Sequence, residues 1–247
     1  MILLTAPMFG SKHLLGLLYV IVLVIVLFAF NKQTGYASNK KMMLKLSIAF
    51  IGLEIIKLSV MTIRDGSFPM NHLPFHLCSL PLYLFPILYF AKENSLLEKY
   101  VKPAAYAGVL MAAILALIIP VNIIGSNDAW FPFTDNFFPL LSFTYHGIMI
   151  FAPLYMLRNK YYDIQYKDIP KAILVTSVLM VIAIITNLIL DSDFMLLNTG
   201  NGSPLAFLLD SGQLIYTLTM ILVGYALLSL VIVITKLIVN LRRKLVT

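Results

Sequence analysis

Two histidines and the only cysteine of the 247-residue chain stand close together in the stretch NHLPFHLC, which ends at Cys78. Histidine and cysteine can bind zinc together, or act as base and nucleophile in group transfer. His72 and His76 are four residues apart and share one face of a regular helix, whereas Cys78 follows His76 by two residues and points about 200° away from it. The spacing disfavours a metal site, and we expect Cys78 to pair with a group from another segment.

His146 lies within a later apolar run and is the histidine best placed to meet Cys78. An imidazole that takes the thiol proton leaves a thiolate, which attacks an ester carbonyl. Both residues also have a structural interpretation, because a single buried cysteine commonly packs as a small apolar side chain. From the residue types alone, the structural interpretation is favoured over the catalytic one. Pro81 cannot donate to the carbonyl of Leu77, so we expect it to bend the helix beside Cys78 and make room for a substrate.

Three more polar side chains lie within apolar runs, where each needs a partner or a function. Glu54 and Lys57 are three residues apart and can form an ion pair on one helical face. The pair either orients its helix, or lets Lys57 hold a phosphate while Glu54 fixes its position. Asn187 stands near the end of another run. We expect these three residues, with His72 and His76, to form the substrate-binding part of one site.

The composition shows where these residues must lie. Hydrophobic residues make up 60% of the chain and charged residues 12%, with a mean hydropathy of +0.92, which is typical of integral membrane proteins. About 20 apolar residues span a bilayer as a helix. The sequence predicts an all-α bundle of seven transmembrane helices in a single domain, residues 1–247. The predicted spans are Leu14–Phe30, Met42–Thr62, Leu73–Phe90, Val101–Val121, Phe137–Leu157, Ile169–Leu190 and Leu214–Val239.

Most of the 18 Lys and Arg residues fall on alternate loops, whereas acids prevail on the remaining loops. The positive-inside rule then places the amino terminus outside and the carboxyl terminus in the cytoplasm. The basic character is thus explained by topology and by contact with anionic lipid, and we expect no nucleic-acid partner. In this topology all the polar residues discussed above fall in the outer half of the membrane, so that one site can form there.

The acid and lysine of the second span (Glu54, Lys57), the stretch HLPFHLCS over residues 72–79 and the later histidine (His146) together resemble the YwaF-like integral membrane proteins of bacteria. That family is related to an animal transmembrane acyltransferase of ether phospholipids, which uses a membrane cysteine and histidine. The resemblance implies a multi-pass protein of the bacterial plasma membrane with Cys78 as nucleophile and His146 as base. It implies that His76 and His72 orient these groups or donate to an oxyanion.

The resulting hypothesis is a membrane lipid acyltransferase or acyl hydrolase whose site opens to the outer leaflet. Its partner is a membrane phospholipid or lyso-lipid, and we expect neither a cofactor nor a metal. The alternative is a non-enzymatic binder or transporter of a small polar or amphiphilic molecule that uses the same polar residues. An apolar groove that ends at Cys78 favours the enzyme, whereas a closed hydrophilic cavity favours the binder.

Overall fold

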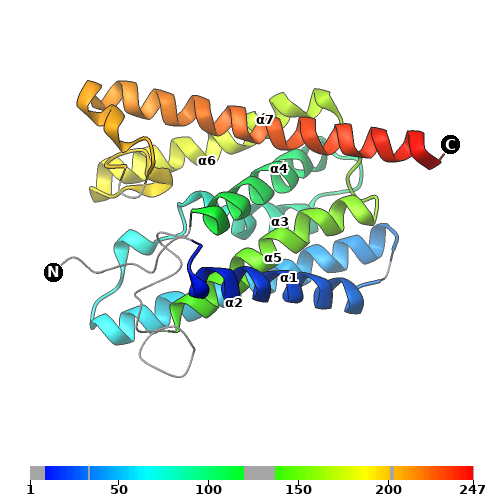
Figure 1. Cartoon of the computed structure of the whole chain (residues 1–247), viewed down its shortest axis with the longest axis horizontal. Coiled ribbons are helices and arrows are strands. Elements are labelled where there is room, and N and C mark those ends of the chain that lie inside the picture. The colour runs from blue at the N-terminus through cyan, green and yellow to red at the C-terminus, as the bar shows by residue number, and fades with distance from the viewer. Residues whose placement is uncertain (1–8, 33, 120–136, 201–202, 247) are drawn as a thin grey trace.

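The computed structural model describes residues 9–32, 34–119, 137–200 and 203–246, and these form helices without a strand. Long helices lie side by side, and successive helices run in opposite directions (Figure 1). The α-helices are α1 (Ser11–Phe30), α2 (Tyr36–Asp65), α3 (Leu80–Phe90), α4 (Leu96–Ile118), α5 (Phe138–Arg158), α6 (Ile169–Leu190) and α7 (Gln213–Val246). The 3₁₀ helices are η1 (Met70–His72), η2 (Leu77–Ser79), η3 (Tyr166–Asp168), η4 (Phe194–Leu196) and η5 (Ala206–Ser211).

Within the described ranges, six helices are long and apolar enough to cross a membrane: α1, α2, α4, α5, α6 and α7. The predicted span 101–121 corresponds to α4, and its last two residues lie outside the described part of the chain. The all-helical membrane class is therefore confirmed. The predicted third span is the exception, because it forms a shorter helix.

Helix α4 is the centre of the bundle and packs against α3, α5, α6 and α7. Its buried face consists largely of small residues, including Ala104, Ala105, Gly108 and Ala112. Small side chains let helix backbones approach closely, which is how membrane helices associate where lipid removes the usual hydrophobic driving force. A Cβ on Gly108 would lie 3.0 Å from Leu80 Cδ1, so that this glycine sets how closely the start of α3 approaches α4.

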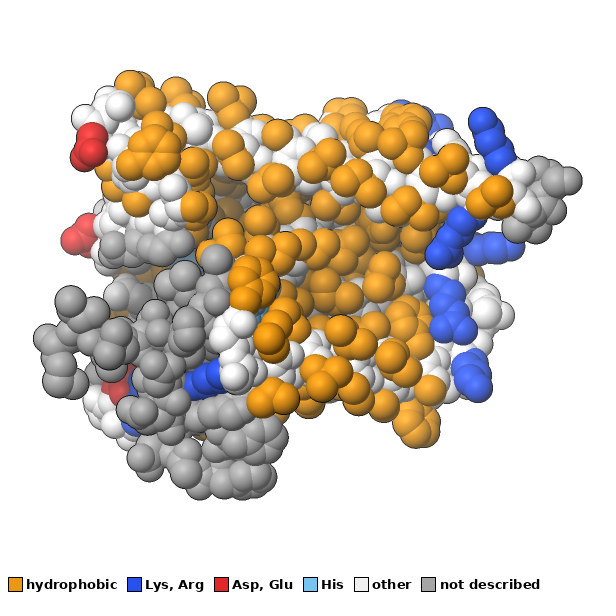
Figure 2. Space-filling model, in the orientation of Figure 1, with side chains coloured by type: hydrophobic (Ala, Val, Ile, Leu, Met, Phe, Trp, Pro, Cys, Tyr) orange, Lys and Arg blue, Asp and Glu red, His pale blue; other side chains and the backbone are white. Residues whose placement is uncertain are grey.

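The surface divides into an apolar side and two polar ends. Figure 2 shows apolar side chains along the length of the bundle, most Lys and Arg at one end, and the Asp and Glu side chains that are visible in this view at the other. The basic end includes Arg158, Lys160 and Arg243, at the carboxyl ends of α5 and α7. The acidic end includes Asp65 and Asp193, after α2 and α6. Such a distribution fits a helical bundle immersed in lipid with both ends in water.

The segment from Leu73 to Pro81 corrects the prediction of a bent third span. Leu73 is extended (φ −55°, ψ 151°) because it precedes Pro74, and the helical backbone begins only at Leu77. Pro81 occupies the first turn of α3, where a missing N–H group costs no helical hydrogen bond. Pro81 therefore helps to start the helix instead of bending it. Cys78 lies in η2, at the amino-terminal start of this short helix.

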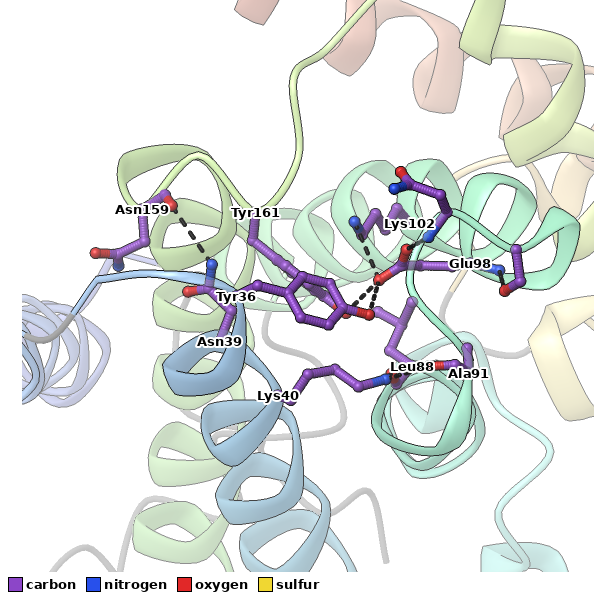
Figure 3. A network of polar contacts seen from close by, with 11 residues as sticks. Tyr36, Asn39, Lys40, Leu88, Ala91, Glu98, Lys102, Asn159 and Tyr161 are labelled. Carbon is purple, nitrogen blue, oxygen red and sulfur yellow. Dashed lines mark hydrogen bonds and ion pairs between the residues drawn. The ribbon is translucent and has the colours of Figure 1, made fainter.

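The other end of α3 is held by Lys40 of α2. Its Nζ donates hydrogen bonds to the backbone carbonyls of Leu88 and Ala91, which Figure 3 shows at the end of the helix. The last carbonyl groups of a helix have no partner within the helix, so a lysine satisfies them well. This contact fixes the 11-residue α3 against α2.

Candidate active site

Cys78 and His146 are in contact, although 68 residues separate them in the sequence. Cys78 Sγ lies 3.2 Å from His146 Nε2, and the other ring nitrogen, Nδ1, lies 2.7 Å from the Ser142 carbonyl oxygen. A carbonyl only accepts, so Nδ1 carries a proton and donates it to Ser142. In the neutral ring, Nε2 then presents its lone pair to the thiol. This is the tautomer that a histidine needs to take the thiol proton.

The surrounding elements bring the pair to the same depth. His146 is the ninth residue of α5, about 12 Å from the acidic end of that helix, and only 5% of its surface is exposed. Cys78 is half-buried in η2, which packs against α4. Ser79 and Leu80 donate their N–H groups to the carbonyls of His76 and Leu77 within this turn, so the N–H groups of Leu77 and Cys78 are those of η2 that have no helical partner.

Glu54 and Lys57 form the predicted ion pair, with 2.7 Å between Glu54 Oε1 and Lys57 Nζ. Glu54 is buried, and Lys57 is half-buried. The Lys57 ammonium is close enough to Cys78 and His146 for its charge to act on both. The charge of Lys57 on α2 is therefore felt at the thiol on η2 and at the imidazole on α5, while its direct contact is with Glu54.

Tyr145 is a site residue that the sequence analysis did not single out. Its hydroxyl is buried and has no hydrogen-bond partner among the described residues. Its ring packs against His146, with 5.8 Å between centroids, and against Phe50 at 4.9 Å. A buried tyrosine hydroxyl normally finds a partner, so an unpaired one beside His146 is free to donate to a bound molecule. In the sequence, the position of Tyr145 directly before His146 within an apolar run was the signal that could have identified it.

The two histidines of the NHLPFHLC stretch have partners other than Cys78. His76 Nε2 donates to the Asn71 carbonyl over 3.2 Å, and its ring packs edge-on against Phe194, with 5.0 Å between centroids. His76 and Cys78 thus point to different partners, as the spacing predicted, although His76 precedes the helix instead of lying in it. His72 lies in η1 and is exposed at the acidic end.

Asn187 holds the loop after α6 over the site. Its Oδ1 accepts from the Phe194 N–H at 2.7 Å, and its Nδ2 donates to the Phe194 carbonyl at 3.0 Å. Phe194, which this clamp positions, packs against His76 and Phe75. Asn187 therefore reaches the NHLPFHLC stretch through Phe194 and does not contact Cys78 directly.

A small apolar hollow lies beside the thiol segment. It measures about 100 Å³, and its lining includes His76 and Leu80, which flank Cys78 in the chain, and Leu179 and Ile182 from α6. Leu80 also packs against α4 at Gly108. Apolar walls of this kind accept a hydrocarbon chain more readily than a polar molecule.

Comparison with protein families adds one finding. The family model described as the TMEM164 family matches residues 8–235. The chain belongs to the TMEM164 family. This match covers every element of the candidate site and agrees with the membrane helices described above. Comparisons with curated proteins and with solved structures found no match.

A second buried histidine of this TMEM164-family chain shows what a structural histidine looks like in the same bundle. His13 on α1 uses both ring nitrogens on the backbone: Nδ1 accepts from the Phe9 N–H at 2.9 Å and Nε2 donates to the Leu117 carbonyl at 2.7 Å. His146 differs because one of its nitrogens faces a thiol. Over the described residues, no cluster of three or more His, Cys, Asp or Glu side chains is arranged to hold a metal ion.

Proposed function

We propose that this TMEM164-family protein is a membrane lipid acyltransferase or acyl hydrolase, with Cys78 as nucleophile and His146 as base. The observation that carries the proposal is the 3.2 Å contact between Sγ and Nε2, in a ring whose other nitrogen donates to the Ser142 carbonyl. A histidine held in this tautomer is the usual activator of a nucleophilic cysteine. The resemblance to YwaF-like proteins and their acyltransferase relative points to the same pair.

The reaction is a double displacement. His146 Nε2 takes the thiol proton, and the thiolate attacks the carbonyl carbon of a phospholipid ester to form a tetrahedral intermediate. As the C–O bond breaks, the imidazolium returns its proton to the leaving oxygen, which gives a lyso-lipid and a thioester on Cys78. An acceptor hydroxyl or water then gives its proton to His146 and attacks the thioester, which releases the acylated product and restores the thiol.

Neighbouring groups supply the remaining charge stabilisation. Lys57, which forms an ion pair with Glu54, is the residue that we propose binds the phosphate of the lipid. The Tyr145 hydroxyl and the first N–H groups of η2 are candidate donors to the oxyanion of the tetrahedral intermediate. His76 lines the hollow for the acyl chain. Asn187 acts as a positioning residue through Phe194, and exposed His72 is a candidate contact for the headgroup.

The proposal places the site in the outer half of a bacterial plasma membrane. In this topology the non-helical residues from Leu73 to His76 and the short helix up to Phe90 together complete the third of seven crossings. Interrupted helices of this kind are tolerated within membranes where they line a cavity or are buried in protein. The amino terminus is then outside, and the basic end is cytoplasmic. A substrate from the outer leaflet reaches Cys78 from the acidic end.

The test is acyl transfer by the purified full-length protein in liposomes that contain a phospholipid with a labelled acyl chain and a lyso-lipid acceptor. Release of labelled fatty acid reports hydrolysis, and labelled phospholipid made from the acceptor reports transfer. We expect Cys78→Ala to reduce both to background, and His146→Ala to lower the rate by about 10²- to 10⁴-fold. Ser79→Ala, in the same turn, is the matched control and should leave the rate unchanged. Full activity in Cys78→Ala would refute the proposal, and saturable lipid binding without turnover would favour the non-enzymatic binder.

A further inference from the structure

A second candidate site lies at the basic end, on the other side of the bundle from Cys78. It is a polar pocket of about 450 Å³ formed by residues from the start of α2, the turn before α4, the first turns of α4 and the segment after α5. We call it the basic-end pocket. Figure 3 shows the network of polar contacts in its wall. No reaction at Cys78 requires this pocket.

Glu98 organises the wall of the basic-end pocket. Only 1% of Glu98 is exposed, and its carboxylate accepts hydrogen bonds from Tyr36 Oη at 3.0 Å, Tyr161 Oη at 3.1 Å and the Asn94 N–H at 2.8 Å. Lys102 Nζ lies 3.2 Å from the same carboxylate. Four partners occupy the acceptor sites of a carboxylate. Glu98 is therefore a structural anchor and has little capacity left for a ligand.

Tyr161 and Lys102 are fixed by this anchor. Burial and the nearby Glu98 carboxylate raise the pKa of Tyr161 well above its usual value, so its hydroxyl stays protonated and donates to Glu98. The Lys102 ammonium lies over the Tyr161 ring at 4.0 Å from the centroid, a distance typical of a cation–π contact. The wall is thus rigid before any ligand arrives, which lowers the entropic cost of binding.

Asn39 is the group that points to a ligand. It lines the pocket, only 3% of it is exposed, and its Oδ1 has no hydrogen-bond partner among the described residues. Its Nδ2 lies 3.5 Å from the Asn159 carbonyl and donates to it, which identifies the other atom as the oxygen. A buried amide oxygen without a partner is unfavourable. Because Oδ1 is itself buried, a ligand in the pocket that donates an N–H or O–H group satisfies it once the Asn39 side chain turns toward the pocket that it lines.

The pocket is lined by two lysines and two glutamates, of which Lys102 is paired with Glu98 and Glu93 is exposed. Lys160 is therefore the group that favours a phosphate as the second feature of the ligand. Lys160 is exposed at the rim, and Lys102 lies deeper in the wall. Ammonium groups bind phosphate oxygens through charge-assisted hydrogen bonds. The pocket also lies at the end of the bundle, level with the headgroup layer, where phosphate is the common group. A ligand with a phosphate at the rim and a donor about three bonds beyond its ester oxygen, as in an ethanolamine or glycerol ester, would meet Lys160 and Asn39 together.

We propose that the basic-end pocket binds a phosphate ester that carries a hydroxyl or amino group. Its source is either the headgroup of a phospholipid in the adjoining leaflet or a soluble phosphoalcohol. The site would distinguish phosphatidylethanolamine and phosphatidylglycerol, whose headgroups carry N–H or O–H donors, from phosphatidylcholine, whose headgroup has none. Asn39 is the residue that makes this distinction, and Lys160 binds the phosphate that all three share.

The test is lipid retention by the purified full chain in detergent, measured by native mass spectrometry with equal amounts of the three lipids in one acyl composition. We expect the wild-type protein to retain the two donor-bearing lipids about tenfold more tightly than phosphatidylcholine, which corresponds to one hydrogen bond to a buried acceptor. Asn39→Leu should remove this preference. Asn31→Leu, which alters an asparagine at the same end but outside the pocket, should keep it.

Two further arms complete the test. Lys160→Ala changes an exposed side chain and should weaken the retention of all three lipids alike, by about three- to tenfold. Displacement of bound lipid by O-phosphoethanolamine or glycerol 3-phosphate would identify a soluble phosphoalcohol as the natural source, and lack of displacement would identify the lipid headgroup. Equal retention of the three lipids by the wild type, an unchanged preference in Asn39→Leu or unchanged retention in Lys160→Ala would each overturn the proposal. The Lys160→Ala measurement tests the proposal even if the Asn39→Leu variant does not fold.

Discussion

Replacing Gly16 by alanine tests how α1 holds α5, and with it His146, in place. A Cβ at Gly16 would lie 2.4 Å from Cζ of Phe143 and 2.6 Å from both of its Cε atoms. Phe143 is only 1% exposed, so its rigid ring has no open space into which to turn. Phe143 and His146 are three residues apart on the same face of α5. The added methyl group must therefore push α5 away from α1 and shift His146 relative to Cys78.

The expected cost follows from two opposing effects. Overpacking a core by a methyl group costs about 1–3 kcal/mol, whereas alanine in place of glycine within a helix regains up to about 1 kcal/mol. Contacts of 2.4–2.6 Å place Gly16→Ala in the upper part of the overpacking range, about 2–3 kcal/mol, so that the net loss is about 1–2 kcal/mol. Gly224 on α7 has no atom within 4 Å of its added Cβ, so Gly224→Ala keeps only the favourable effect and should gain about 0.5–1 kcal/mol.

Thermal unfolding of the two variants in one detergent measures this difference. In a chain of this size 1 kcal/mol corresponds to about 2–4 °C, so Gly16→Ala should unfold several degrees below the wild type and Gly224→Ala slightly above it. Gly16→Ala should also lose acyl transfer at temperatures where it remains folded, since the contact between thiol and imidazole depends on α5. An unfolding temperature for Gly16→Ala equal to that of Gly224→Ala would refute the reasoning.

Three other predictions concern polar side chains. Glu98→Gln removes the charge from a buried ion pair and leaves one oxygen in place of the two that accept from Tyr36, Tyr161 and the Asn94 N–H, and it should lower the unfolding free energy by about 3 kcal/mol or more. Exposed Glu93→Gln should change it by less than about 0.5 kcal/mol. Burial and the nearby Asp168 carboxylate raise the pKa of Tyr162, so above pH 10 the unfolded state loses this proton and the folded state does not. Stability should thus fall by up to about 1.4 kcal/mol per pH unit above pH 10, and less steeply in Tyr162→Phe. Tyr145→Phe should lower acyl transfer by about 10²-fold without lowering the unfolding temperature, because the lost hydroxyl has no partner to lose.

Each of these has a result that contradicts it. Equal unfolding temperatures for the Glu98 and Glu93 variants would mean that the carboxylate network adds nothing to stability. The same alkaline slope in Tyr162→Phe and wild type would remove Tyr162 as its cause. A lower unfolding temperature in Tyr145→Phe, with transfer reduced only in proportion to the folded fraction, would make Tyr145 a packing residue.

Most of the fold is predictable from the sequence because a membrane imposes a simple rule on run length and hydropathy. The runs that became α1, α2 and α4 to α7 meet that rule. The rule fails between Leu73 and Pro81, where apolar composition persists but two prolines influence the backbone: Pro74 keeps its neighbour extended, and Pro81 occupies the first helical turn, a position that proline favours. Local backbone chemistry, not hydropathy, decides where α3 begins.

The site was predictable in part, for a related reason. The contact between Cys78 and His146 could be predicted because the expected topology puts both residues at a similar depth below one membrane surface, where few other polar side chains lie. The clamp of Asn187 on Phe194 and the unpaired hydroxyl of Tyr145 depend on how a loop and a ring pack, which spacing does not encode. Glu98 is a further case, since its position three residues after Ser95 indicates only a helix cap, and its tyrosine partners come from distant segments.

The central claim is that Cys78 carries the acyl group during the reaction. The most direct measurement is mass spectrometry of the Cys78 peptide after a brief incubation of the full-length protein with a phospholipid that bears a labelled acyl chain, followed by acid quenching. The account predicts a labelled acyl adduct on Cys78 that hydroxylamine removes, much less adduct in folded His146→Ala, and a wild-type amount in Ser79→Ala. Acyl transfer by the wild-type protein with no adduct on Cys78 at any time during turnover would contradict it.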